Sequence, residues 1–195
     1  MANIPTTAFA RAAMRMLEQL GRTFKQPVCV ILAGGAAVHM YAPDARISAD
    51  VDAEFQARVV IPSDLLVSYT DEQGNLRTLS LDSNYNTTLG LIHENYVEDS
   101  IDLGIHADGK IHLRVMSPLD LAVSKISRWA DNDREDIRLL AERGLITSGK
   151  LRERAQEALD YYVGYPPAVK LNIEDAVAMV EEVENARDGT HPICR

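Results

Sequence analysis

Cysteine, tryptophan and long apolar runs are all scarce in this sequence. Among 195 residues there are two cysteines and one tryptophan. Cys29 lies in an apolar run and Cys194 at the C-terminus, so the two provide neither a disulfide framework nor a cysteine-based zinc site. No stretch approaches the roughly 18 apolar residues of a membrane span, and the N-terminus lacks the pattern of a signal peptide. We therefore expect a cytoplasmic protein with no membrane partner.

Positive charge is also in the minority. The chain has 20 Lys and Arg against 29 Asp and Glu, a net charge of −9. Broad non-specific binding to nucleic acid depends on neutralising phosphates, so this balance argues against it and leaves only a local basic patch open. The five histidines show no spacing typical of a zinc site. Ordinary contents of hydrophobic (46%) and charged (25%) residues predict a globular chain that folds throughout.

Strand and helix patterns alternate in the first part of the chain. Apolar spacing predicts an amphipathic helix over residues 6–24, and a continuous apolar run predicts a buried strand at Val28–Leu32. Alternation of apolar and acidic residues predicts a half-buried strand at Asp50–Phe55, with Asp50 and Asp52 on one side. Hairpins are predicted over 65–81 and 101–115.

The second of these hairpins can be given a register. If residues 107–109 form a three-residue turn, Ile101, Leu103 and Ile105 face Val115, Leu113 and Ile111. Asp102 then lies opposite Arg114.

Strand patterns stop after Val115. Capping residues and glycines bound four predicted helices, at 117–130, 133–144, 148–163 and 172–187. We therefore expect an α/β (α+β) fold with a mixed sheet and flanking helices in residues 1–116, and a C-terminal helical bundle in residues 117–195.

A phosphate site is suggested by the residues around the buried strand. Gly34 and Gly35 follow that strand and open a helix, where free backbone N–H groups and the helix dipole favour an anion. Asp50 and Asp52 could hold the cation that bridges bound phosphates. Each feature also has a simpler interpretation: the glycines could form only a tight turn, and the aspartates could be the solvated face of an edge strand.

Two separated motifs give the chain a family resemblance. The glycine pair followed by Arg-Ile-Ser-Ala-Asp-Val-Asp at 46–52 resembles the GG…R-x-[ST]-x-D-[IV]-D signature of AbiEii-like nucleotidyltransferases. A later group resembles the P-x-D-L…K-[LI]-x-R…R-x-D-[IL] pattern of the same proteins: Pro118 to Leu121, Lys125, Arg128 and Asp133 to Ile137. Two motifs in the right order are more specific than either alone.

The resemblance implies a nucleotidyltransferase-like fold and a set of site residues. In the family the D-x-D pair, here Asp50 and Asp52, binds one or two Mg²⁺ ions of an incoming nucleoside triphosphate such as ATP, and a third acid on a neighbouring strand completes the metal site. Asp102 is our candidate for the third acid, with a cross-strand pair to Arg114 as the alternative. The residues expected at the nucleotide are Gly34, Gly35, Arg46, Ser48 and Lys125. Lys125 and Arg128 could instead pair with Asp131 or Glu135 on the surface.

The implied activity is transfer of a nucleoside monophosphate to a hydroxyl of RNA, including tRNA, or of a protein. Toxin–antitoxin or phage-defence roles, with a cognate antitoxin as partner, also follow from the resemblance. One departure supports a different hypothesis. Many members carry Ser or Thr directly after the glycine pair, where this chain has Ala36. A catalytically silent relative that binds nucleotide or a partner protein is therefore the alternative.

Overall fold

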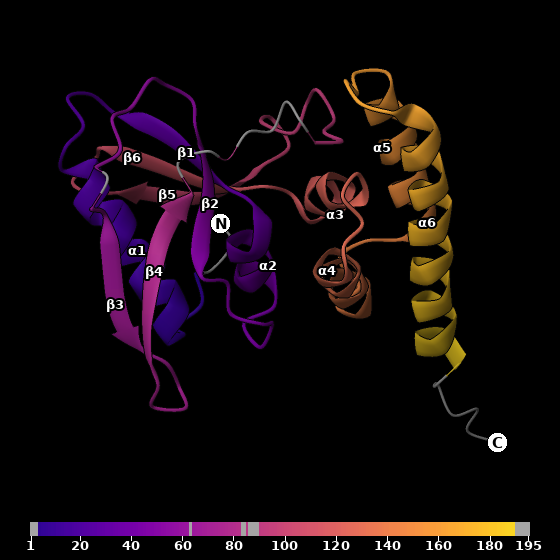
Figure 1. Ribbon diagram of the computed structural model, residues 1–195, viewed down its shortest axis with the longest axis horizontal. Helices are drawn as coiled ribbons and strands as arrows, with labels where there is room; N and C mark the ends of the chain where they lie inside the picture. Colours follow the sequence, from indigo (N-terminus) through magenta and orange to yellow (C-terminus); the bar gives the residue numbers. More distant parts are fainter. Residues whose placement is uncertain (1–3, 63, 83–84, 86–89, 190–195) are drawn as a thin grey trace. The chain divides into compact units, whose positions relative to one another are not determined.

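The chain divides into two units, each described here by itself (Figure 1). The structure is a computed structural model and describes residues 4–62, 64–82, 85 and 90–189. The first unit comprises Met1–Tyr85 and Val97–Ser117, and the second comprises Asn86–Tyr96 and Pro118–Arg195.

A six-stranded mixed sheet forms the first unit. Its strands are β1 (Val28–Leu32), β2 (Asp50–Phe55), β3 (Leu66–Thr70), β4 (Leu76–Asp82), β5 (Ile101–His106) and β6 (Ile111–Val115). Their order across the sheet is β3-β4-β2-β1-β6-β5. The pairs β1/β6 and β2/β4 are parallel, and the other three neighbouring pairs are antiparallel. This arrangement confirms the predicted mixed sheet.

Helix α1 (Ala8–Gly21) packs against β3, β4 and β6. Its amphipathic sequence explains the contact, because the buried stripe includes Phe9, Met16 and Leu17. The side chain of Thr7 caps the helix by accepting a hydrogen bond from the N–H of Ala10 at 3.2 Å. The helix is confirmed, although it is shorter than the predicted range of residues 6–24.

The two faces of β2 differ in polarity. Val51 and Ala53 are buried, while Asp50 and Asp52 point to the opposite face and are half-buried. The sheet thus buries its apolar side chains on one face and carries the two acids on the other, as the alternation predicts.

The turn between β3 and β4 is organised by a buried carboxylate. Asp71 accepts hydrogen bonds from the N–H groups of Gln73 and Asn75 at 3.0 and 2.7 Å and from Nε of Arg77 at 2.9 Å. Desolvation raises the pKa of Asp71, but these hydrogen bonds outweigh it and hold the pKa at about 2. The carboxylate therefore stays ionised and fixes the geometry of the turn.

The β5–β6 hairpin departs from its predicted register. Ile101 pairs with Val115 and Asp102 with Arg114, as predicted, but a bulge follows and Gly104 pairs with Leu113. The predicted pairing of Leu103 with Leu113 and of Ile105 with Ile111 is therefore wrong. Gly104 has a φ of +102°, a conformation that L residues rarely adopt, so the extra residue is accommodated at this glycine.

Four helices dominate the second unit: α3 (Pro118–Ile126), α4 (Asp131–Glu142), α5 (Ser148–Leu159) and α6 (Pro166–Gly189). They confirm the helical C-terminal part, with α6 beginning six residues before its predicted start. Tyr161 and Tyr165, which follow α5, are exposed by 53% and 71%. Within the described residues, no helix has both the length and the hydrophobicity needed to cross a bilayer.

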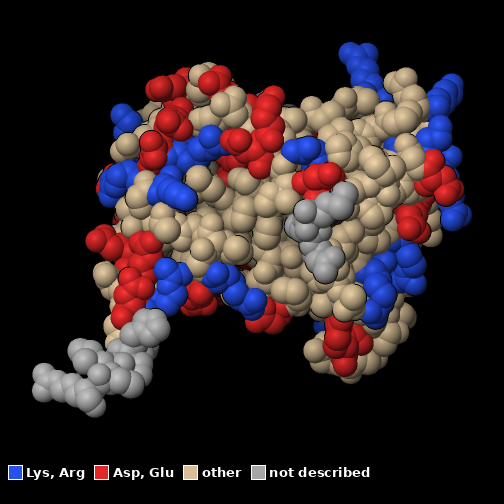
Figure 2. Space-filling view, turned by 180° about the vertical axis from the view of Figure 1, so that it is seen from behind, with Lys and Arg blue, Asp and Glu red and all other residues tan. Residues whose placement is uncertain are grey.

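Figure 2 shows the charged side chains on one face of the molecule. On the described part of the face drawn in Figure 2, Asp and Glu lie beside Lys and Arg.

Candidate active site

The Gly-Gly bend lies against an acid of β2. Gly34 opens α2 (Gly34–Tyr41) with a φ of +53°, directly after the extended residue Ala33. A Cβ atom at position 34 would lie 1.6 Å from Oδ2 of Asp52, and the N–H of Ala33 donates to the carbonyl of Asp52 at 2.9 Å. Both the backbone conformation and the close approach require glycine.

Ser48 lies beside Gly35 and is hydrogen-bonded to Asp50. A Cβ atom at Gly35 would lie 3.1 Å from the Cβ of Ser48 and 3.2 Å from its Oγ. The same hydroxyl donates a hydrogen bond to Oδ1 of Asp50 at 2.8 Å. The structure therefore brings together five of the predicted site residues: Gly34, Gly35, Ser48, Asp50 and Asp52.

The strand beside β2 supplies an acid that the sequence analysis missed. In the parallel pair of β2 and β4, Asp52 is the register partner of Asp82, and Asp50 is the partner of Ser80. Register partners on neighbouring strands carry their side chains on the same face, with about 4.8 Å between the strands. Asp82 thus belongs to the face and the end of the sheet that carry the aspartate pair.

A signal for Asp82 was present in the sequence. Leu79, Ser80, Leu81 and Asp82 continue the alternation of the strand, but the predicted hairpin ended at residue 81. The parallel pairing of β4 with β2 joins segments that are not consecutive in the chain, and residue patterns alone do not reveal such a neighbour.

The structure does not bring Asp102 to this site. Its strand, β5, is separated from β2 by β1 and β6. Three strand spacings amount to about 14 Å, which exceeds the reach of a shared metal ion. The condition for Asp102 to complete the metal site was that its strand neighbours β2, and that condition is not met.

Asp102 has other partners on the sheet. It accepts hydrogen bonds from the N–H of Gly104 at 2.8 Å and from Nε2 of His112 at 3.0 Å, and these two interactions lower its pKa. Arg114 is the cross-strand neighbour, as the alternative predicted, but its Nε donates to Ser100 at 2.5 Å.

Arg46 and Lys125 lie in different units. Arg46 is exposed in the segment that precedes Ser48. Lys125 is on α3 in the helical unit, only 5% exposed, with its Nζ 2.7 Å from Oδ2 of Asp136 and 3.8 Å from Oδ1 of Asp133. The surface pairs suggested for Lys125 are therefore wrong, since its partners are buried and lie on the inner side of α4. Its role at a nucleotide stays a prediction.

Arg128 also has a different partner from the two suggested. Its Nε and Nη2 donate to the two carboxylate oxygens of Asp133 at 2.7 and 2.6 Å. Desolvation raises the pKa of Asp133, but the hydrogen bonds from Arg128 and the nearby charge of Lys125 outweigh it, so the pKa is lowered. This part of the second motif thus joins the turn after α3 to α4.

The donor chemistry of the β2 and β4 acids fits a hard divalent cation. Mg²⁺ prefers oxygen ligands and is commonly held by one or two carboxylates together with substrate phosphates and water. Across residues 4–62, 64–82, 85 and 90–189, no three His, Cys, Asp or Glu side chains are already arranged to hold a metal ion.

One comparison with known proteins gives a result. No curated protein and no solved structure matches the chain. A family model described as "Nucleotidyltransferase of unknown function (DUF6036)" matches residues 11–185, which include the glycine bend, both strands that carry the acids and most of the helical unit. Its description names neither a substrate nor the AbiEii-like proteins. Because the match spans most of the chain, the protein belongs to this nucleotidyltransferase family.

Proposed function

We propose that the protein transfers a nucleoside monophosphate from a nucleoside triphosphate to a hydroxyl group of RNA or protein, with Mg²⁺ as cofactor. The observation that supports this most directly is the contact between Gly34 and Asp52. The two glycines leave the backbone N–H groups at the helix start accessible, and a carboxylate lies directly beside them. This arrangement suits the binding of a metal–polyphosphate.

Each residue of the cluster has a role in this proposal. The N–H groups at the start of α2 bind the phosphates, helped by the positive end of the helix dipole. Asp50 and Asp52 hold Mg²⁺, and Ser48 orients the Asp50 carboxylate through its 2.8 Å hydrogen bond. Bound Mg²⁺ supplies neutralisation of the phosphate charge.

The reaction is an in-line displacement at phosphorus. The acceptor oxygen forms a bond to the α-phosphorus, the bond from that phosphorus to the β-bridging oxygen breaks, and pyrophosphate leaves. Asp82, the register partner of Asp52, accepts the proton of the attacking hydroxyl. The products are the nucleotidylated acceptor and pyrophosphate.

The resemblance of residues 46–52 to the AbiEii-like signature supports a finer proposal about biology. An enzyme of that kind modifies RNA, tRNA among the candidates, or protein in the cytoplasm, as a toxin-like or phage-defence component held in check by a cognate antitoxin. ATP is one of the four nucleoside triphosphates whose transfer is compared in the experiment below.

Label transfer tests the proposed activity. The full chain is incubated with Mg²⁺, total RNA and each of the four triphosphates labelled at the α-phosphate, and RNA and protein are separated. We expect label in one fraction, and its loss in Asp52→Asn. The matched control is Asp64→Asn, which makes the same change at an exposed turn residue of the same unit. Unchanged transfer by Asp52→Asn would contradict the proposal.

The silent relative is the second candidate function. Ala36 lies fully buried in the first turn of α2, so this position offers no hydroxyl to a phosphate. Mg²⁺-dependent binding of a triphosphate, measured by calorimetry, without label transfer to RNA or protein would favour this candidate. Absence of both binding and transfer would contradict the two candidates together.

A further inference from the structure

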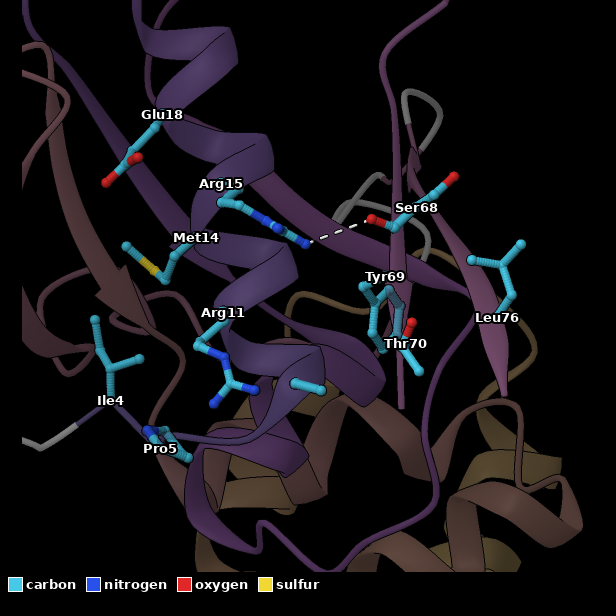
Figure 3. Close-up of a pocket in the computed structure, with 11 residues that line it drawn as sticks. Ile4, Pro5, Arg11, Met14, Arg15, Glu18, Ser68, Tyr69, Thr70 and Leu76 are labelled. Carbon is cyan, nitrogen blue, oxygen red and sulfur yellow. Dashed lines mark hydrogen bonds between the residues drawn. The ribbon is translucent and has the colours of Figure 1, made fainter. Parts of the chain in front are cut away.

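A groove runs between α1 and β3. It encloses about 640 Å³ and is lined on the helix side by Ile4, Pro5, Ala8, Arg11, Met14, Arg15 and Glu18, and on the sheet side by Ser68, Tyr69, Thr70 and Leu76. Figure 3 shows Arg15 extending from the helix toward the strand and Arg11 extending toward the start of the helix, where its Nη1 donates to the carbonyl oxygen of Thr6. All of these residues belong to the first unit.

The strand that borders the groove is an edge of the sheet. β3 is the first strand in the sheet order, with β4 on one side and, among the described residues, no strand on the other. An edge strand presents unpaired N–H and C=O groups, which another extended chain can pair with.

The register shows which backbone groups point into the groove. The N–H of Asp71 donates to the carbonyl of Asn75 at 2.9 Å, which makes them a hydrogen-bonded pair beside the turn. Bonded and non-bonded pairs alternate along an antiparallel ladder. Three pairs are therefore non-bonded: Thr70 with Leu76, Ser68 with Thr78, and Leu66 with Ser80. The N–H and C=O groups of Leu66, Ser68 and Thr70 are thus directed away from β4.

A contact from α1 supports this assignment independently. Nη2 of Arg15 donates to the carbonyl oxygen of Ser68 at 3.4 Å, the contact drawn as a dashed line in Figure 3. The carbonyl of Ser68 therefore points toward the groove. The contact is long and its donor is exposed, so an incoming backbone N–H can replace it at little cost.

Side chains on the two sides of this edge differ in character. On the helix side the groove carries two arginines against one acid, Glu18, in a chain whose net charge is −9. Leu66 and Leu76, whose side chains share one face of the β3–β4 pair, are exposed by 58% and 78%, and Leu76 also lines the groove. A strand added to β3 would place its alternate side chains next to the arginines and next to these leucines.

We propose that this edge binds an extended segment of a partner protein, in which acidic residues alternate with apolar ones. Backbone pairing with Leu66, Ser68 and Thr70 gives the segment its affinity and its register. Arg11 and Arg15 select acidic side chains over basic ones.

Peptide selection on the full chain tests the chemistry of the partner. A random-peptide phage library is panned on the protein, and selected peptides are synthesised for affinity measurement. We expect enrichment of segments with alternating acidic and apolar residues, and affinity reduced about tenfold or more in the Arg11→Glu/Arg15→Glu variant. Arg22→Glu, which makes the same change on an exposed residue at the end of α1, is the matched control and should bind normally. Failure to enrich acidic segments, or equal binding by the groove variant and the control, would overturn the proposal.

Two further measurements separate strand addition from simple charge attraction. Ser68→Pro removes one outward N–H and leaves the ladder to β4 intact, so it should abolish binding while circular dichroism and thermal unfolding stay near those of the unmodified protein. In the unmodified protein, the amides of Leu66, Ser68 and Thr70 should gain protection from hydrogen exchange when peptide is added. Lack of that protection would contradict backbone pairing. Concentration-dependent dimerisation abolished by Ser68→Pro would assign the edge to a second copy of the chain and also overturn the proposal.

Discussion

Gly34 and Asp52 are in such close contact that no side chain fits between them. A Cβ atom on residue 34 would lie 1.6 Å from one carboxylate oxygen of Asp52, well inside any contact distance. The glycine of the bend and the acid of β2 are therefore a single structural element. A side chain at position 34 would therefore displace the carboxylate of Asp52.

Gly34→Ala should impair both folding and nucleotide binding. The φ of +53° and the overlap with Asp52 each disfavour a Cβ atom, and we expect a loss of about 1–3 kcal/mol in the free energy of unfolding. Urea unfolding and Mg²⁺-dependent triphosphate binding measure the two effects. The matched control is Gly74→Ala, where φ is +84° but a Cβ atom would meet nothing within 4 Å. The control should lose some stability and retain nucleotide binding. Equal nucleotide affinity in both variants would contradict a phosphate role for the bend.

Asp82→Asn and Asp102→Asn should have different effects on the proposed transfer reaction. Asp82 is the register partner of Asp52, whereas Asp102 lies on a strand separated from β2 by two others. We expect Asp82→Asn to lower the rate of label transfer by about 100-fold, the order of loss that follows removal of a general base. Asp102→Asn should retain most of the activity. A large loss in Asp102→Asn with normal activity in Asp82→Asn would refute this assignment.

Local sequence patterns predicted most of the helices and strands, and they predicted the glycine bend and the aspartate pair of the candidate site. The alternation of Asp50–Phe55 sufficed to place Asp50 and Asp52 on one face, and the glycine pair after β1 predicted the bend. Asp82 was missed because its position depends on the pairing of β4 with β2, which is a property of the whole sheet. Asp102 was predicted as the third acid without knowledge of the strand order, because the alternation of residues along a strand does not show which strands are neighbours.

The remaining differences also involve interactions that periodicity does not record. The bulge at Gly104 changes the hairpin register at one residue, and a strict alternation cannot include it. Lys125 and Asp136 are eleven positions apart on different helices, and their burial depends on how α3 packs on α4. In each case the local sequence allowed more than one arrangement and tertiary packing selected one.

Lys125→Met should destabilise the helical unit. The substitution leaves the 3%-exposed carboxylate of Asp136 without its 2.7 Å partner, and breaking a buried pair from one side costs about 3–5 kcal/mol. The double variant Lys125→Met/Asp136→Leu removes both charges and should regain much of the loss, as urea unfolding can measure. The double variant also tests the functional prediction. A folded double variant that has lost triphosphate affinity would assign Lys125 to the nucleotide, whereas normal affinity would restrict it to a structural role.

Stability should fall as the pH drops below about 6.5, the usual pKa of an unfolded histidine, because of His39 on α2. Burial lowers the pKa of this side chain in the folded protein. Its Nε2 lies 2.7 Å from Oγ1 of Thr7, and within the described residues its buried Nδ1 has no hydrogen-bond partner. In the folded protein, a proton added to Nδ1 would find no hydrogen-bond acceptor in the part of the chain that the structure describes. As the pH falls, the unfolded chain therefore takes up a proton on this histidine before the folded protein does. Unfolding consequently binds more protons below this pH, and its free energy decreases as the pH is lowered.

Urea unfolding at about pH 7.5 and about pH 5.5 checks this sign, since the two values lie on either side of the titration of an unfolded histidine. His39→Gln cannot titrate, so the difference in unfolding free energy between the two pH values should be smaller in this variant than in the unmodified protein. His106→Gln, on β5 and not fully buried, serves as the matched control and should keep the original difference. If His39→Gln retained the full pH dependence, the buried ring of His39 could not be its source. The loss of stability would then have to come from the other ionisable groups, since a group that does not titrate cannot link folding to pH.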